Sequence, residues 1–291
     1  MKTVSLVLGS GGARGLAHIG VIRWLEDNGY DIRHIAGASI GSVIGGIHAA
    51  GKLDEFEQWV QAISRVDILT FLDVAWGKGG LVKGDRIINA LIDLVGDQHI
   101  EDLPMRFTAV ATDLERQKEV RFTSGRLFDA IRASMSVPLL FTPFNLNGID
   151  YVDGGVLNPV PVAVMMDDDT DFTIAVHCGG FSAPPPNRET SPSSTSIFPS
   201  AFQERIRTFM QKLQSSDDSE KTRDWGSYEV AIQSFETMQN FIARQQLAVH
   251  PPDAIIEIPR NACRTLDYDR AAEMIELGNE SASNTIPACL G

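Results

Sequence analysis

The chain has 291 residues, of which 43% are hydrophobic and 22% are charged, a balance typical of a globular protein with a sizeable core. This composition excludes collagen-like, coiled-coil and wholly disordered chains. The formal net charge of −13 would repel a phosphate backbone, so nucleic acid is excluded as a partner. It also weakens long-range attraction to an anionic membrane, but leaves open a transient contact with a membrane surface through a small apolar face.

The cysteines and the uncharged segments indicate the cellular compartment in which the protein is expected. Cys178, Cys263 and Cys289 are odd in number and form no CxxC pair, which favours a reducing environment without a disulfide framework. The apolar stretch in Thr3–Leu8 is too short for a secretory signal peptide, and the uncharged run Ile35–Gly51 is too glycine-rich and too short for a membrane helix. We therefore expect a cytoplasmic protein.

The first fifty residues alternate between strand and helix patterns. Thr3–Leu8 is a short apolar run that predicts a buried strand, and Leu16–Asn28 has apolar residues at helical spacing. His34–Ala38 predicts a second strand, and Ile40–Ala50 predicts a helix of small residues. This alternation is typical of a parallel α/β fold.

The middle of the chain continues the alternation. Helices are predicted near Arg86–Val95 and Leu127–Met135, and strands at Phe107–Asp113 and Phe172–Cys178. The fold class expected is therefore α/β, with three layers and a mostly parallel central sheet flanked by helices.

Residues 181–200 differ in composition from the rest of the chain. They hold three consecutive prolines and many serines and threonines, which predicts a flexible loop. A lid over an apolar site is the alternative interpretation. Composition favours the plain loop, because it indicates mobility and not purpose.

The C-terminal part, 201–291, is expected to be mainly helical. Amphipathic helices are predicted at Ala201–Gln214 and Tyr228–Leu247, followed by a strand at Ala254–Glu257 and a closing helix from Asp267. No internal repeat is visible, so residues 1–291 are expected to form one domain that carries a helical segment.

The strongest local signal for chemistry is Gly37-Ala38-Ser39-Ile40-Gly41. A nucleophilic serine on a sharp strand-to-helix turn needs small neighbours two residues away, and here both Gly37 and Gly41 are glycine. The following helix would direct free N–H groups toward developing negative charge. The alternative is a glycine-rich turn in which Ser39 merely caps the helix.

A second glycine-rich loop, Gly9–Gly15, lies between the first strand and its helix. Its backbone N–H groups can turn toward an anion. A dinucleotide is disfavoured, because Arg14 stands where the third glycine of GxGxxG belongs. An oxyanion fits better, since the carboxyl ends of neighbouring parallel strands would bring this loop and Ser39 to one edge of the sheet.

Two further patterns are set aside. Gly46–Lys52 matches the spacing of a phosphate loop, but Leu53 replaces the Ser/Thr that would hold magnesium, and the segment lies in a predicted helix. Asp167–Asp171 lacks the glycine and glutamate of a calcium loop and indicates a solvated turn. We expect no metal and no cofactor.

A catalytic serine needs a base, and six histidines are available. His18 and His48 fall in predicted helices, whereas His177 lies at the end of a predicted strand. Asp153, followed by two glycines, places a carboxylate on a tight loop and is the better candidate. Considered alone, it is more simply an ordinary turn aspartate that bonds its own backbone.

Four motifs together carry a resemblance. The glycine-rich loop 9–15, the Gly37–Gly41 motif, Arg132–Pro138 and Asp153-Gly154-Gly155 occur in the order and at the spacing of the patatin-like phospholipase family. The chain is most similar to its compact bacterial cytoplasmic members. Four motifs in order are far more specific than GxSxG alone.

The resemblance implies a patatin-like fold and a serine acyl hydrolase of (phospho)lipid or related esters. It implies Ser39 as nucleophile and Asp153 as base, with Gly11, Gly12 and Arg14 at the oxyanion site. The partner would then be a lipid or fatty-acyl ester, and no oligomeric state is assigned. One departure is Ser10, where the family usually has glycine.

Two other hypotheses remain open at this point. One is a Ser-His-Asp esterase that uses His177 or His250 as base. The other is a non-catalytic module that binds a lipid or a partner, with Ser39 only structural. Mutation of the histidines would test the first, and a serine-directed phosphonate probe would test the second.

Overall fold

A computed structural model describes residues 1–64, 67, 82–182 and 226–290. The chain divides into two compact units: the first comprises Met1–Ala183 and Phe235–Gly291, and the second Pro184–Ser234. The first unit holds the sheet and every element discussed below, apart from the beginning of one helix. Most of the predicted loop 181–200 and the predicted helix Ala201–Gln214 lie outside the described residues.

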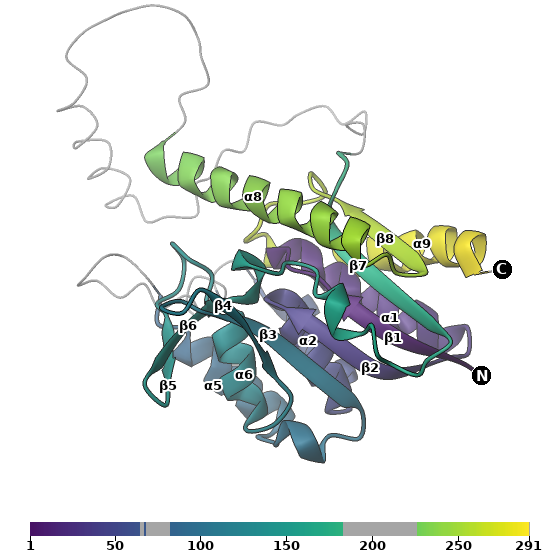
Figure 1. Cartoon of the computed structure of the whole chain (residues 1–291), viewed down its shortest axis with the longest axis horizontal. Coiled ribbons are helices and arrows are strands. Elements are labelled where there is room, and N and C mark those ends of the chain that lie inside the picture. Colours follow the sequence, from purple (N-terminus) through teal and green to yellow (C-terminus); the bar gives the residue numbers. More distant parts are fainter. Residues whose placement is uncertain (65–66, 68–81, 183–225, 291) are drawn as a thin grey trace, which may run out of the picture. The chain divides into compact units, whose positions relative to one another are not determined.

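The first unit is built on one eight-stranded sheet (Figure 1). Its path runs β5-β6-β3-β2-β1-β7-β8, and β4 also pairs with β3. The five strands from β3 to β8 along this path are parallel, whereas β4, β5 and β6 are joined by antiparallel pairing. The strands are β1 (Lys2–Leu8), β2 (Tyr30–Ala38), β3 (Arg106–Asp113), β4 (Lys118–Phe122), β5 (Phe144–Leu146), β6 (Ile149–Asp153), β7 (Phe172–Gly180) and β8 (Ala254–Pro259).

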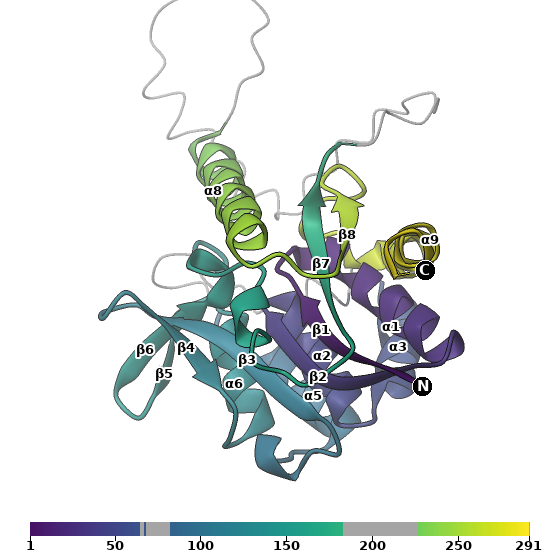
Figure 2. The same ribbon diagram turned by 45° about the vertical axis from the view of Figure 1, so that its right-hand side comes forward.

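Most helices of the first unit lie on one face of the sheet. Their apolar side chains form the main core with alternate residues of β1, β2, β7 and β8. The opposite face is covered by α8 and by the 3-10 turn Val162–Val164, through a smaller core that includes Val7, Ala175 and Ala243. Figure 2 shows α8 and α9 on opposite sides of β7 and β8. The helices are α1 (Ala17–Asp27), α2 (Ile40–Ala49), α3 (Leu53–Ala62), α5 (Asp85–Val95), α6 (Leu127–Ser134), α8 (Ser227–Val249) and α9 (Ala271–Leu290).

The central strands form because apolar, β-branched runs bury both of their faces. Every residue of β1 from Val4 to Leu8 is buried, and so is every residue of β3 from Phe107 to Asp113. A parallel strand between two helical layers requires this continuous burial. The expected α/β class with a mostly parallel sheet is therefore confirmed.

The structure adds elements that the sequence patterns did not predict, namely α3 and the antiparallel strands β4, β5 and β6. These strands are short, and β4 has no buried residue. Their hydrophobic signal is therefore weak, because only part of each strand contributes to the core. The predicted central elements agree with the observed ones to within a few residues at their ends.

Two glycines allow α1 and α9 to approach at backbone distance. A Cβ at Gly20 would lie 1.9 Å from the Ile275 carbonyl oxygen, and one at Gly278 would lie 1.9 Å from that of Ala17. No side chain fits in either place. The helix that follows the first glycine-rich loop is thus held directly against the last helix.

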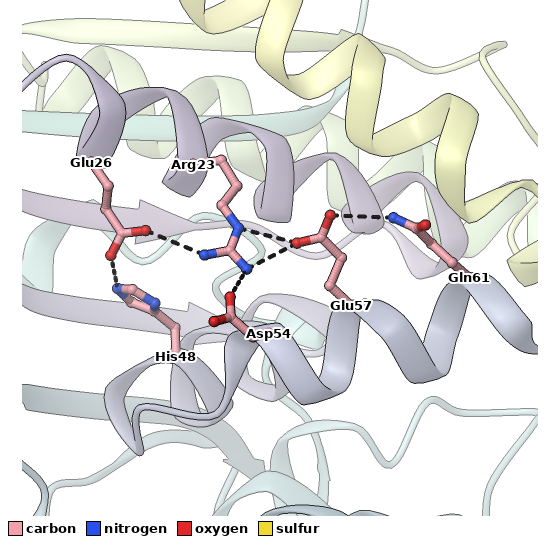
Figure 3. Close-up of polar contacts among 6 residues, drawn as sticks. All are labelled: Arg23, Glu26, His48, Asp54, Glu57 and Gln61. Carbon is pink, nitrogen blue, oxygen red and sulfur yellow. Dashed lines mark hydrogen bonds and ion pairs between the residues drawn. The ribbon is translucent and has the colours of Figure 1, made fainter.

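On the outer side of the helical layer, a polar network links α1 to α3 (Figure 3). The Arg23 guanidinium bonds to Asp54 and donates to Glu57 at 3.0 Å, both on α3. It also lies 3.6 Å from Glu26 on its own helix. Such partly exposed pairs contribute little energy individually, so the network orients α3 more than it stabilises the fold.

We predict that Gly20→Ala and Gly278→Ala each lower the free energy of unfolding by about 2–3 kcal/mol, because the added methyl group forces the two helices apart. Helix propensity alone would predict the opposite sign, a gain of about 1 kcal/mol. Urea denaturation measures the change. Ser283→Ala on the exposed side of α9 is the control and should change stability by less than about 0.5 kcal/mol. A neutral or stabilising effect of both glycine substitutions would contradict the close contact.

Candidate active site

Ser39 lies on a sharp turn between β2 and α2. Its backbone angles are φ 57° and ψ −125°, a conformation that L-residues rarely adopt. Such strain persists only where the surrounding structure enforces it, and it is common at functional sites. Ser39 is 6% exposed as a whole residue, so it lies at the edge of the core and not in bulk solvent.

The two glycines around Ser39 are required by contacts with backbone. A Cβ at Gly37 would lie 2.3 Å from the Gly41 carbonyl oxygen, because the chain folds back on itself across the turn. A Cβ at Gly41 would lie 2.0 Å from the carbonyl oxygen of Leu8, at the end of the neighbouring strand. The turn therefore has the tight geometry that GxSxG predicts, and it lies against the start of the glycine-rich loop.

The pairing of β3 brings Asp153 next to Ser39. Along one edge of β3, Val110 pairs with Ala38 of β2, and the next residue, Ala111, pairs with Asp153 of β6. The opposite edge of β3 is occupied by β4. Strand β6 therefore pairs with the same edge of β3 as β2 does, beginning where β2 ends. Asp153 lies opposite Ala111, the position that Ser39 would occupy if β2 continued.

The Asp153 carboxylate is fully buried. Its Oδ1 accepts a hydrogen bond from Gly155 N–H at 2.7 Å, whereas Oδ2 has no partner of regular hydrogen-bond geometry among the described residues. Burial raises the pKa of Asp153 to about 7, and hydrogen bonding with the Ser39 hydroxyl and Gly155 N–H opposes this rise. A base with such a pKa can accept a proton near neutral pH.

Segment 132–138 holds the backbones of both residues. The Ser134 hydroxyl accepts the Ser39 N–H at 3.0 Å and donates to the Val110 carbonyl at 2.6 Å. The Ser136 carbonyl accepts the Asp153 N–H at 3.0 Å. One turn of chain at the end of α6 thus fixes nucleophile and carboxylate relative to each other.

The glycine-rich loop is fastened on several sides. Gly9 N–H donates to the Val176 carbonyl at 3.1 Å, Ser10 N–H to that of Pro159 at 2.8 Å, and Ala13 N–H to that of Thr265 at 2.8 Å. The N–H groups of Gly11 and Gly12 donate no hydrogen bond within the part of the chain that the structure describes. These two groups are therefore available for an anion.

His18, on α1, holds the glycine-rich loop through a hydrogen bond. Its Nε2 donates to the Gly9 carbonyl at 2.8 Å, and burial lowers the pKa of His18 to about 4, so the ring is neutral. The fully buried Cys178 lies beside it, with Sγ 3.7 Å from the same nitrogen. A Cβ at Gly11 would lie 2.4 Å from the Cβ of Cys178, which explains why the loop needs glycine there.

Arg14 follows the two free N–H groups but points elsewhere. Its guanidinium donates to the Arg260 carbonyl at 2.9 Å and to the Glu236 carboxylate at 3.0 Å. Glu236 also accepts a hydrogen bond from the Thr265 hydroxyl. These contacts indicate that Arg14 fixes the end of the loop. The backbone N–H groups of Gly11 and Gly12 therefore remain the free donors of this loop.

The two histidines of the alternative hypothesis lie elsewhere. His250 follows α8 and precedes the start of β8, so it lies at the amino ends of the parallel strands, opposite to Ser39. His177 lies at the correct edge, but β1 separates β7 from β2, a backbone separation of about 10 Å. No hydrogen bond joins either histidine to Ser39 in the described residues. The geometry brings together Ser39 and Asp153 instead.

Several residues of the site were not found from the sequence. Ser134 and Ser136 lie in the quoted Arg132–Pro138 motif, but nothing in the pattern showed which group each one holds. The 3-10 turn after Asp153 depends on Gly154, whose Cβ would lie 2.0 Å from the Val110 carbonyl oxygen. Glu236 gave no signal, because its contact with Arg14 joins residues that are 222 positions apart.

No group of three or more His, Cys, Asp or Glu side chains among the described residues is arranged to hold a metal ion. None of the helices described is both long enough and apolar enough to span a bilayer.

Comparison with protein families gives one match over most of the sheet and the whole site. A family model described as patatin-like phospholipase matches residues 6–166. This range contains the glycine-rich loop, Ser39, the Arg132–Pro138 segment and Asp153. The match covers more than half of the chain.

Individual relatives extend the similarity. Uncharacterized NTE family proteins of Mycobacterium bovis and Mycobacterium tuberculosis are 38% identical over 330 aligned residues, covering 98% of this chain and 91% of theirs. Lysophospholipase NTE1 of Yarrowia lipolytica is 34% identical over 186 residues, covering 61% of this chain and 13% of that protein. The crystal structure of VipD from Legionella pneumophila matches 97% of this chain and 66% of its own, with a TM-score of 0.46 and 14% identity.

We predict that Asp153→Asn stabilises the protein at pH 8. The pKa of Asp153 is raised in the fold, so the folded state holds a proton that the unfolded chain has lost, and stability falls as pH rises from about 4 through 7. Asparagine removes this cost, which for a pKa raised from its ordinary value of 3.8 to about 7 is on the order of 4 kcal/mol. Thermal unfolding at pH 8 and pH 4 measures the difference.

The gain should nearly disappear at pH 4, because Asp153 is protonated in the folded state there and close to its half-titration point in the unfolded chain. Asp150→Asn on the same strand, at an exposed position, is the matched control and should show no such pH-dependent gain. A variant less stable than wild type at both pH values would contradict the buried, destabilising carboxylate.

Proposed function

The chain belongs to the patatin-like phospholipase family of lipid acyl hydrolases, and on that basis we propose that it cleaves carboxylic esters of phospholipids or related lipids with a Ser39–Asp153 dyad. The observation that supports this most directly is the shared edge of β3, along which β2 delivers Ser39 and β6 delivers Asp153. Fold resemblance alone would not choose the residues, because function depends on the site.

In the first half of the proposed reaction, Asp153 accepts the Ser39 proton as Oγ attacks the ester carbonyl carbon. The negative charge that develops on the carbonyl oxygen is stabilised by the N–H groups of Gly11 and Gly12. One such donor typically contributes about 10²–10³-fold to the rate. The alcohol then leaves with the proton from Asp153, and Ser39 carries the acyl group.

In the second half, Asp153 takes a proton from water, whose oxygen attacks the acyl-serine carbonyl. The fatty acid leaves, and the proton returns to Ser39 Oγ. A buried carboxylate with a pKa near 7 suits both halves, because it exchanges protons near neutral pH more readily than an exposed carboxylate.

Arg14 is proposed as a positioning residue of the oxyanion loop. Its bonds to Arg260 and Glu236 hold the end of the loop, so the free N–H groups keep their direction. In this proposal its charge stabilises the anion only from a distance.

The substrate class first to be tested is lysophospholipid, since the fungal relative is named a lysophospholipase.

The proposed site of action is the cytoplasm. Free thiols at Cys178, Cys263 and Cys289 support this proposal, because disulfides are rare in that compartment.

We predict that Ser39→Ala and Asp153→Asn each abolish hydrolysis of p-nitrophenyl esters of rising chain length, with losses of at least about 10³-fold in kcat. Labelling by a fluorophosphonate probe separates the two variants. Ser39→Ala lacks the hydroxyl and should not be labelled at all, whereas Asp153→Asn keeps the hydroxyl without its base and should be labelled much more slowly than wild type. Mass spectrometry locates the label.

The control for this experiment is Ser42→Ala, which removes a neighbouring buried hydroxyl that bonds to the Ser39 carbonyl without taking part in the proposed chemistry. Substantial turnover by Asp153→Asn would refute the dyad and direct attention to His177. Absence of both labelling and hydrolysis in folded wild type would favour a non-catalytic lipid-binding module.

We predict that kcat/KM rises with pH and levels off above about pH 7. The base must be ionised, so activity falls about tenfold per pH unit below the pKa of Asp153, which burial raises to about 7. The profile is measured by quantifying quenched product between pH 5 and pH 9. A plateau that extends down to pH 5 would contradict a buried carboxylate base.

A further inference from the structure

Among the described residues, buried polar atoms without partners gather near the carboxyl ends of β1, β6 and β7. Such atoms are uncommon in folded proteins, because an unmet hydrogen bond costs free energy. Among the described residues, only His48 and Arg132 supply examples away from the loops that end β1, β6 and β7. The atoms at or near these loops are Ser10 Oγ, Arg14 Nε, His18 Nδ1, Asp153 Oδ2, Asn158 Oδ1 and His177 Nε2.

Ser10 lies close to the Asp153 carboxylate, on the other side of Gly155. Its N–H is already bonded to the Pro159 carbonyl, so only the hydroxyl is free. A Cβ placed at Gly155 would lie 2.4 Å from Ser10 Oγ and 2.9 Å from Asp153 Oδ1. The Ser10 hydroxyl and the Asp153 carboxylate therefore converge on the position that a side chain at residue 155 would occupy.

Helix α8 supplies a third group to the same space. The same Cβ position at Gly155 would lie 2.3 Å from Gln239 Nε2. Gln239 is half-buried and lies three residues after Glu236, which holds Arg14. The face of α8 that covers the carboxyl ends of the strands is therefore polar at Glu236 and Gln239. The same face is apolar at Ala243 and Leu247, which follow in the next turns of the helix.

We propose that Ser10 and Gln239 position the water that hydrolyses the acyl-enzyme. This inference rests on the proposed dyad, and it concerns only the second half of the reaction. A hydroxyl can donate and accept, and a side-chain amide can do both as well, so the two groups can hold one water in a fixed orientation. A bound water typically makes about three hydrogen bonds, and Asp153 Oδ2 would provide the third.

The proposed step needs no reactant other than water. The water oxygen bonds to the acyl carbon while one water proton passes to Asp153. The tetrahedral intermediate then collapses, the bond from the carbon to Ser39 Oγ breaks, and the proton on Asp153 passes to that oxygen. Ser10 and Gln239 exchange no proton in this scheme, which makes them positioning residues.

The experiment compares acylation and deacylation in one assay. Rapid mixing with a p-nitrophenyl ester shows acylation as p-nitrophenol release, and deacylation as the following steady rate. In Ser10→Ala, deacylation should slow about tenfold, the effect of one lost hydrogen bond. Because kcat/KM reports acylation only, it should stay within about twofold of wild type while kcat and KM fall together.

Three companion variants make the result specific. Ser10→Thr keeps a hydroxyl and should retain most of the deacylation rate. Gln239→Leu should slow deacylation as Ser10→Ala does. Gln245→Leu makes the same change at an exposed position of the same helix and should have no effect.

The possible outcomes are distinct. Slower deacylation with unchanged kcat/KM in Ser10→Ala and Gln239→Leu, and recovery in Ser10→Thr, would establish the water-positioning role. An equal fall in kcat and kcat/KM would show that these residues only support the loop, and no change would show that the water is held elsewhere; both results overturn the inference. Wild type that forms no acyl-enzyme would overturn the proposed function itself.

Discussion

The site depends on one constraint, the sharing of a single edge of β3 by two strands that run in opposite directions. β2 occupies that edge up to Val110, and β6 occupies it from Ala111 onward. The chain of β2 must leave the sheet where β6 begins, and this departure is the strained turn at Ser39. The strained turn and the carboxylate therefore lie side by side, because β3 extends past the last residue of β2 and pairs there with β6.

The same arrangement sets stability against activity. Asp153 is useful as a base because burial raises its pKa toward neutrality, but a buried carboxylate without a charged partner destabilises the fold. The surrounding backbone compensates through many fixed contacts. Ser134 and Ser136, two residues apart, hold the nucleophile and the carboxylate respectively, so the geometry of the pair is determined by one short segment.

The elements of the central sheet could be predicted because their signals are local. Ser39 between two glycines specifies a tight turn, and the five parallel strands are apolar runs. The β5–β6 hairpin was missed although Asn147 and Gly148, both with positive φ, are the residue pair that a two-residue hairpin turn favours. Other features depend on topology and on contacts between distant segments, which the hydrophobic periodicity of a sequence does not report. Examples are the contacts of Gln239 and Glu236 and the position of His250 at the opposite edge of the sheet.

The loop that would bind the oxyanion is held by segments that lie far along the chain from it. Arg14 bonds to the Arg260 carbonyl 246 residues later, Ala13 bonds to Thr265, and α1 lies against α9 through Gly20 and Gly278. Contacts of such large sequence separation form late in folding. A nascent chain that has not yet reached Arg260 would carry Ser39 and Asp153 without the contacts that fix the proposed anion-binding loop.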